Sequence, residues 1–276
     1  MGEPGQGLRV TATYNELSER RENAYMTCAQ AVLSLFLFSP CDNGGGSDEA
    51  VRAAVENSAR PPADVARDAA RKPSEILEFF EIEPGMTVLD VFAGGGYYTE
   101  ILNQLVGPEG KVFSHNNVAY EGFVGEELSA RFANDRLGNV ERVTAEANEL
   151  DFEDGSLDAA LMILAYHDFF FGNEQYAWPR VDEQAFLESL CRDLKPGAIL
   201  GVVDHVANPG GDISEVAFSL HRLDPQKVIS DMTDSCFDFA EESDLLRHPE
   251  DDHTLPAISP ELRGKTDRFV YKFVRR

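Results

Sequence analysis

The feature that most constrains the fold is an apolar segment that runs directly into three consecutive glycines. TVLDVFA (87–93) is compact and apolar, and GGGYYTEILNQLVG (94–107) opens with the glycines and continues with helical spacing. Glycine adopts backbone dihedrals that other residues resist, and the first turn of a helix presents free N–H groups. A strand, a glycine loop and a helix in this order predict a site for a nucleotide-like ligand.

The rest of the chain alternates between strand-like and helix-like segments. Further apolar strands are predicted at 111–116, 139–146, 157–166 and 198–205, and helices at 73–82, 121–136 and 181–194. Continuous apolar strands separated by helices are typical of a parallel sheet covered on both faces. FDFAEES and DRFVYKFVRR, near the C-terminus, alternate as strands do and are expected to pair as an antiparallel edge. The fold class is therefore α/β: a doubly wound, mostly parallel seven-stranded sheet with an antiparallel C-terminal edge strand and helices on both faces.

The charge balance excludes one class of partner. The chain has 49 acidic and 24 basic residues, for a net charge of −25. Such a surface repels phosphate backbones, so we expect no nucleic-acid partner and favour a small-molecule substrate. No apolar run reaches the roughly 18 residues that a membrane-spanning helix needs, so no transmembrane span is expected.

The glycine loop and the segments after it resemble the class I S-adenosylmethionine-dependent methyltransferases. In that family an acidic residue precedes glycines at alternate positions; Asp90, Gly94 and Gly96 match, while Phe92 stands where a first glycine is common. AEANELDFEDGSLD and LKPGAILGVVD match later motifs in the correct order. The resemblance implies a Rossmann-like fold and S-adenosylmethionine as cofactor. Residues 56–274 are also similar to a group of bacterial predicted methyltransferases, many of which carry signal peptides.

The resemblance also implies which residues bind the cofactor. The loop that packs on its methionine part corresponds to Gly94, Gly95, Gly96 and Tyr97. Asn116 stands where the family usually has an acid that binds both ribose hydroxyls, and an amide can still bond to hydroxyls. Glu146 and Ala147 take the place that contacts adenine.

Two other functions remain open. The segment lacks the Gly-Lys-Ser/Thr of a P-loop, which argues against ATP hydrolysis, and Thr99 stands where a GxGxxG motif has its third glycine. The alternatives to a methyltransferase are a non-catalytic module that binds S-adenosylmethionine and, less favoured, an NAD(P)-linked oxidoreductase.

Polar residues follow the fourth and fifth predicted strands, where parallel α/β sheets bind ligands. Candidate catalytic residues are His167, Asp168 and His205, with His167 as general base and Asp168 as its orienting partner. Tyr166, His221 and Arg222 are the candidate substrate-binding residues, and the FFFG segment (169–172) is a candidate wall of the acceptor pocket. Each histidine is alternatively a hydrogen-bonded scaffold residue. We assign no metal ligands, although the His–Asp set offers an alternative divalent-metal site.

The first fifty residues are expected to be a tail, followed by one domain over 51–276. Ala29–Pro40 is a short apolar run that follows Arg20 and Arg21 and ends at Cys41, before a Gly-rich acidic tether. This pattern is typical of a secretory signal and resembles a bacterial lipoprotein, which would carry a lipid anchor. The alternative is an amphipathic helix packed on the domain. The location is the cell envelope or periplasm if the segment is processed and the cytoplasm otherwise; synthesis of the cofactor in the cytosol argues against export.

The cysteines lack the usual signature of a zinc or redox site. Cys28, Cys41, Cys191 and Cys236 include no CxxC pair. Cys191 lies in the helical pattern AFLESLCRDL and is expected to be a small core residue.

Removal of the N-terminal segment is directly testable. If residues 26–41 are an export signal, the mature protein should begin at or after Cys41. Intact-mass measurement of the protein from its native source checks this. A mass that includes residues 1–40 would rule out processing.

Overall fold

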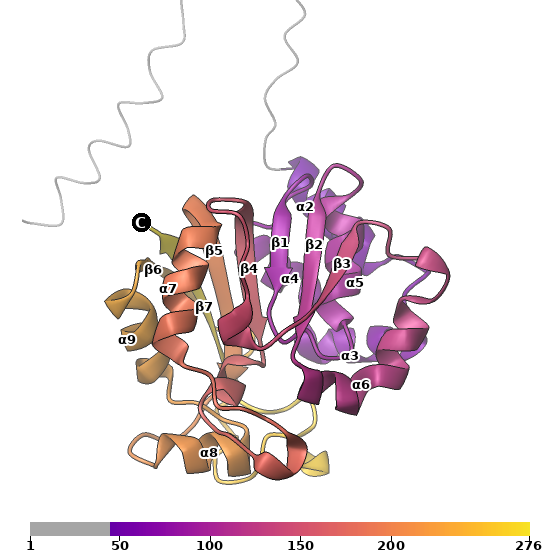
Figure 1. Ribbon diagram of the computed structural model, residues 1–276. Coiled ribbons are helices and arrows are strands. Elements are labelled where there is room, and N and C mark those ends of the chain that lie inside the picture. The colour runs from indigo at the N-terminus through magenta and orange to yellow at the C-terminus, as the bar shows by residue number, and fades with distance from the viewer. Residues whose placement is uncertain (1–44) are drawn as a thin grey trace, which may run out of the picture. The chain divides into compact units, whose positions relative to one another are not determined.

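The computed structural model describes residues 45–276, which form a seven-stranded sheet (Figure 1). The strand order is β3-β2-β1-β4-β5-β7-β6. Strands β1 to β5 pair in parallel, and β7 pairs antiparallel with both β5 and β6. The strands are β1 (Thr87–Asp90), β2 (Lys111–Asn116), β3 (Val140–Thr144), β4 (Leu157–Ile163), β5 (Leu194–His205), β6 (Phe237–Ser243) and β7 (Arg268–Arg275).

This topology confirms the predicted α/β fold class and its antiparallel C-terminal strand. The antiparallel strand β7 lies one position inside the sheet, and β6 is the outermost strand. Strand β5 begins at Leu194 rather than at 198, because Leu194 pairs with Leu157 across an irregularity in the register with β4.

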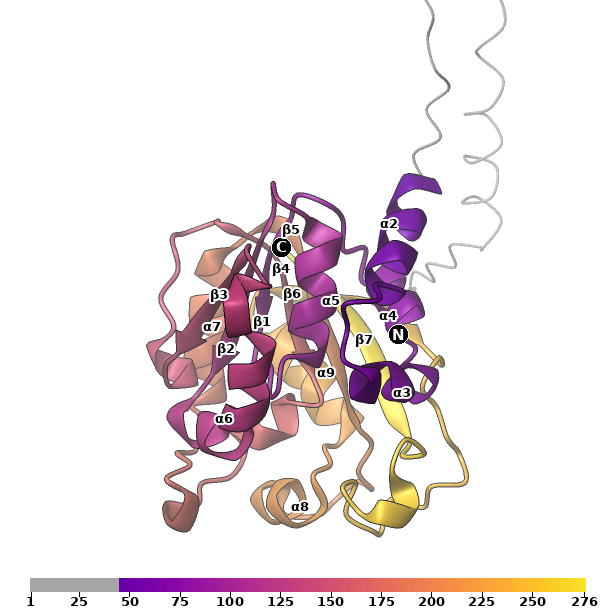
Figure 2. The ribbon, with the colours of Figure 1, turned by 90° about the vertical axis from the view of Figure 1, so that its right-hand side faces the viewer.

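Helices cover both faces of the sheet, as predicted. They are α2 (Gly45–Val55), α3 (Pro62–Arg71), α4 (Pro73–Phe79), α5 (Tyr97–Val106), α6 (Val118–Arg131), α7 (Glu183–Asp193), α8 (Ile213–Leu220) and α9 (Pro225–Asp234). Figure 2 shows α2 and α4 on one side of the sheet and α7 on the other. Successive residues of β1 belong to opposite cores: Val88 packs in the cluster of α4 and α5, and Leu89 in that of α7 and α9.

The carboxyl ends of β1, β2, β4 and β5 form the edge that positions the site. Two non-glycine residues there, Phe92 after β1 and Leu164 after β4, have positive φ angles of 49° and 59°. These left-handed residues turn the chain sharply where each strand ends. The short helix η3 (Tyr166–Phe169) follows β4, and α8 follows β5 (Figure 1).

The predicted tail, with its signal-like segment and Cys41, lies outside the described residues apart from its last few positions, where α2 begins. Among the helices of the described part, none is long and apolar enough to cross a membrane.

The structure corrects the prediction that Cys191 is a simple core residue. Cys191 on α7 forms a disulfide with Cys236, which directly precedes β6. The pair is separated by 45 residues in the sequence and joins α7 to the far edge of the sheet. Pattern analysis missed the pairing because it depends on how α7 packs beside β6.

Reduction of the disulfide should lower the free energy of unfolding by about 2–4 kcal/mol, since the cross-link restricts the unfolded chain. Urea unfolding with and without reductant checks this. Alkylation under denaturing conditions serves as the control: the reduced protein should gain two more alkyl groups than the unreduced one, at Cys191 and Cys236. Equal unfolding curves, with the extra labelling confirmed, would contradict the expected stabilisation.

Candidate active site

The glycine loop between β1 and α5 is tightly enclosed. Gly94 and Gly96 have φ angles of +58° and +80°, the left-handed region that glycine enters at least cost. A Cβ atom on Gly95 would lie 2.2 Å from the Glu127 carboxylate, and one on Gly96 would lie 2.7 Å from Cδ of Arg131. The sequence uses glycine here because neither the backbone conformation nor α6 leaves room for a side chain.

Arg131 on α6 is the centre of a buried ion cluster around this loop. Its guanidinium bonds to Asp64 Oδ2 on α3 at 2.8 Å and also to Glu100 on α5. Its Nε donates to the carbonyl of Gly95. The Arg131 and Asp64 side chains are only 2% and 3% exposed, so the ion pair holds α3, α5, α6 and the loop as one unit.

Asn116, at the end of β2, supports the loop from the other side. Its Oδ1 accepts a hydrogen bond from the Gly94 N–H at 2.9 Å, and its Nδ2 donates to the Gly94 carbonyl at 3.0 Å. The amide predicted to bind ribose is therefore engaged with the loop backbone.

Asn117, the next residue in the chain, and Glu146 each have a buried side-chain atom that forms no hydrogen bond with the residues the structure describes. Asn117 caps α6 through Oδ1, while its buried Nδ2 has no hydrogen-bond partner among the described residues. The buried Oε2 of Glu146, after β3, likewise has none there. Burial raises the pKa of Glu146 despite the nearby Asn117 amide. A buried unpaired polar atom costs about 1–3 kcal/mol, so this donor and acceptor fit a polar ligand over the ends of β2 and β3.

Asp90 and Tyr97, both predicted to contact the cofactor, instead form hydrogen bonds with neighbouring parts of the protein. Asp90 is buried and accepts a hydrogen bond from Thr99 Oγ1 at 2.6 Å, and burial raises its pKa to about 6. The Tyr97 hydroxyl donates to Asp68 on α3 at 2.6 Å. Both side chains thus connect neighbouring elements.

An aromatic cluster stands beside the loop. The Phe92 ring, in the place of the common first glycine, packs against His115, Tyr120, Phe169 and Trp178 at centroid distances of 5.1 to 5.8 Å. The FFFG segment, predicted to line the acceptor pocket, lies mostly in the hydrophobic core. Phe169 and Phe170 are fully buried, and Phe171 stacks on Trp178.

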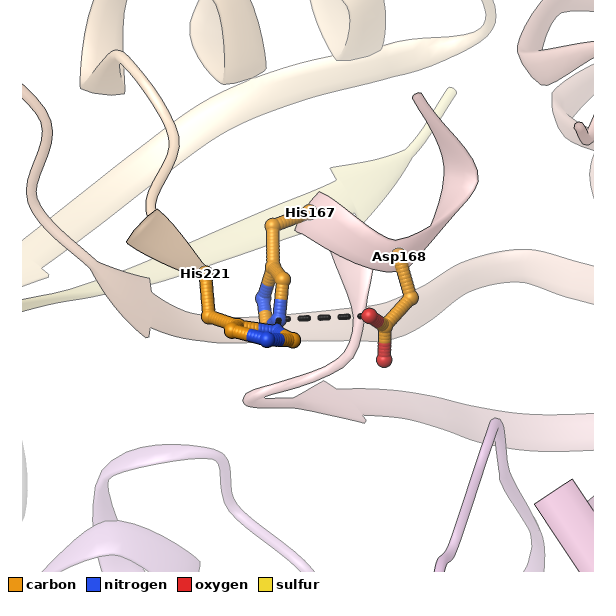
Figure 3. Close-up of side chains that lie close together, drawn as sticks. All are labelled: His167, Asp168 and His221. Atoms are coloured by element: carbon orange, nitrogen blue, oxygen red, sulfur yellow. Dashed lines mark hydrogen bonds and ion pairs between the residues drawn. The ribbon is translucent and has the colours of Figure 1, made fainter. Parts of the chain in front are cut away.

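His167 is the centre of the polar cluster after β4 (Figure 3). Its Nδ1 lies 2.8 Å from Asp204 Oδ1, and its backbone N–H donates to Asp204 Oδ2 at 2.9 Å. Its Nε2 lies 3.3 Å from both Asp168 Oδ1 and His221 Nδ1. Burial alone would lower the His167 pKa, but the Asp204 and Asp168 carboxylates raise it to about 9.

This geometry corrects the predicted orienting partner of His167. Asp204 at the end of β5, not Asp168, makes the short contact, and it is fully buried. Asp168 makes the longer contact, 3.3 Å from Nε2 of His167, and its other oxygen accepts a hydrogen bond from the Tyr120 hydroxyl at 3.1 Å. The sequence favoured Asp168 because it directly follows His167 in the chain, whereas Asp204 lies 37 residues away.

The structure does not support the predicted substrate contacts of Tyr166 and Arg222. Tyr166 is fully buried and its hydroxyl donates to Asp231 at 2.9 Å. Arg222 is also fully buried: it pairs with Asp251 at 2.9 Å and donates to two backbone carbonyls. His221 is partly exposed and does join the cluster.

A cavity of about 920 Å³ lies between α3, α6 and the loop before β7. His205, Leu164, Arg71 and Arg268 are among its lining residues. Arg268 is 3% exposed, and burial and the nearby Arg71 charge lower its pKa to about 10. Neither arginine has a carboxylate partner among the described residues. Sequence analysis missed both, because nothing in the local pattern distinguishes them from solvated arginines.

Comparisons with known proteins agree with this fold. Residues 64–145 match the protein-L-isoaspartate(D-aspartate) O-methyltransferase family. The ubiquinone/menaquinone biosynthesis C-methyltransferase UbiE of Ectopseudomonas mendocina is 26% identical over 192 residues, 66% of each chain. Demethylmenaquinone methyltransferase of Listeria monocytogenes is 31% identical over 134 residues, 47% of this chain and 49% of that protein. The chain thus aligns with two thirds or less of these relatives' length.

Solved structures share the fold at low sequence identity. A SAM-dependent methyltransferase from Aquifex aeolicus is 22% identical with a TM-score of 0.52, covering 76% of this chain and 98% of that one. Geranyl diphosphate C-methyltransferase from Streptomyces coelicolor is 13% identical with a TM-score of 0.53, covering 82% and 89%. The chain therefore has the fold of the class I S-adenosylmethionine-dependent methyltransferases and is similar in sequence to members of that class. S-adenosylmethionine is the cofactor of this class.

The buried carboxyl of Asp90 gives a stability prediction. Its pKa in the folded protein, about 6, exceeds the ordinary 3.8, so its contribution to stability is present at low pH and is lost as the pH rises through 6. Asp90→Asn should match the wild type near pH 4 and be more stable by about 1–3 kcal/mol near pH 7. Urea unfolding at both pH values checks this.

Glu109→Gln is the matched control, since it removes one exposed carboxylate from the same acidic chain. If Asp90→Asn differs from the wild type equally at both pH values, the raised pKa is wrong.

Proposed function

We propose that this protein transfers a methyl group from S-adenosylmethionine to a small, anionic acceptor held in the cavity between α3, α6 and the loop before β7. The observation that carries the proposal is the enclosed left-handed loop, with the unpaired polar atoms of Asn117 and Glu146 at the neighbouring strand ends. These residues fit the cofactor: Asn117 Nδ2 is a donor and Glu146 Oε2 an acceptor for its adenosine part. The bound cofactor supplies the activated methyl group.

The chain's own residues provide enclosure and orientation. The packed rings of Phe92, Tyr120 and Trp178 form an apolar wall that excludes water beside the loop. His205 lines the cavity, and burial lowers its pKa to about 3, so its imidazole is neutral and available to hydrogen-bond an acceptor. His167 as general base stays a prediction, and both its ring nitrogens already have polar neighbours.

The anionic character of the acceptor follows from Arg71 and Arg268. In a chain of net charge −25, carboxylates are plentiful, yet these two guanidiniums face the cavity without one. A buried cation without a counter-ion is costly, and a ligand carboxylate or phosphate would offset that cost. The carboxylate of the cofactor is the other possible source of this anion.

Enzymes with this fold catalyse different reactions, so the relatives support methyl transfer but do not establish the reaction of this chain. The UbiE match is named a C-methyltransferase and the family match an O-methyltransferase, which favours methyl transfer over the NAD(P)-linked alternative. Neither fixes the acceptor of this chain.

We also propose export as the location. The Cys191–Cys236 disulfide supports it, because such bonds persist mainly in oxidising compartments. A signal or lipoprotein segment at the N-terminus would deliver the domain there.

Methyl transfer can be tested with the full chain, methyl-labelled S-adenosylmethionine and a small-molecule extract. We expect label in compounds that an anion exchanger retains. Arg71→Met and Arg268→Met should lower this transfer by about 10-fold or more, because charge-assisted bonds contribute strongly to binding. Arg180→Met, outside the cavity, is the control.

A second measurement separates the two sources of the anion. If the arginines hold the acceptor, affinity for S-adenosylhomocysteine stays unchanged in both variants. If they hold the cofactor's carboxylate, that affinity falls, while affinity for methylthioadenosine, which lacks the carboxylate, does not. Bound cofactor with no labelled product from any extract would favour the non-catalytic binding module.

A further inference from the structure

We propose that His167, Asp168 and His221 form a binding site for one divalent transition-metal ion, a site beyond the proposed methyl transfer. Each residue offers one ligand atom, and the three atoms lie within 4.8 Å of one another. His167 and Asp168 come from η3 and His221 from the C-terminal end of α8, so the fold brings together residues 54 positions apart (Figure 3).

Two of the three distances between ligand atoms are those of ligands around one ion. Nε2 of His167 lies 3.3 Å from Nδ1 of His221 and 3.3 Å from Oδ1 of Asp168. Atoms bound tetrahedrally to zinc at about 2.0–2.1 Å lie about 3.3 Å apart. Two imidazole nitrogens that face each other at this distance can share a metal ion with no proton between them.

Asp204 is not one of the three proposed ligands, but it orients His167. It accepts from Nδ1 of His167 at 2.8 Å and from two backbone N–H groups, those of His167 and His205. This fixes the ring, so Nε2, which releases its proton when a metal ion binds, is directed away from Asp204 toward the other two ligands. Metal-binding histidines commonly have a carboxylate in this position. The Tyr120 hydroxyl holds Asp168 in the same way, at 3.1 Å.

His221 has a left-handed backbone conformation at the end of α8. It caps α8 with φ 50° and ψ 51°, a left-handed conformation that is uncommon for a residue with a side chain. Such conformations are retained where the surrounding structure requires them. His167 and Asp168 are 4% and 5% exposed, while His221 is partly exposed and gives an ion access from its side.

The donor set selects the class of metal. Two imidazoles and one carboxylate suit zinc, iron or cobalt, whereas magnesium and calcium prefer ligand sets made of oxygen. Three protein ligands leave at least one coordination position open. The His167 ring centroid is 6.3 Å from that of His205, which lines the cavity, so the metal site borders the proposed acceptor site.

Cobalt titration of the chelator-treated full chain tests the proposal. We expect visible absorption bands of four- or five-coordinate Co²⁺ that saturate at one ion per chain and that Zn²⁺ abolishes by displacement. His221→Asn and Asp168→Asn should each reduce affinity by about 100-fold or more, while His248→Ala, outside the cluster, should bind as the wild type does. Asparagine tolerates the left-handed backbone, so His221→Asn should still fold.

Circular dichroism and melting of each metal-free variant confirm folding. A wild type that shows no saturable 1:1 binding of Co²⁺ or Zn²⁺ overturns the proposal. So does wild-type affinity in both ligand variants. Because the readout is metal binding, the result stands whether or not methyl transfer is found.

Discussion

The buried guanidinium of Arg131 is the interaction on which the site depends. It joins α3 through Asp64, α5 through Glu100 and the glycine loop through the Gly95 carbonyl. Removing one member of a buried ion pair leaves an uncompensated charge and costs about 3–5 kcal/mol. The loop therefore keeps its left-handed turns because α3 and α6 are held to it, and the same helices form walls of the cavity.

Buried charge is arranged differently on the two sides of His205. On one side, the His167 imidazole lies between the Asp204 and Asp168 carboxylates. On the other, Arg71 and Arg268 have no carboxylate partner in the described part of the chain. The first arrangement fits a cation bound by histidine and carboxylate, and the second fits an anion. A small acidic acceptor in the cavity would lie between them.

The sequence predicted the fold because its strands are apolar throughout and its glycine loop is local. It could not predict the contacts that depend on register. Asp204 meets His167 only because β4 and β5 are neighbours with matched ends, and Cys191 meets Cys236 only once α7 lies beside β6. Tyr166 was misplaced for a simpler reason: β4 ends at Ile163, and the turn into η3 directs the tyrosine to the core instead of the cleft.

Equilibrium dialysis of the full chain against labelled S-adenosylmethionine tests the central claim most directly. The enclosed loop and the unpaired atoms of Asn117 and Glu146 predict saturable binding of one cofactor per chain, with a dissociation constant on the order of micromolar. Absence of saturable binding by chain that circular dichroism shows to be folded would contradict the account.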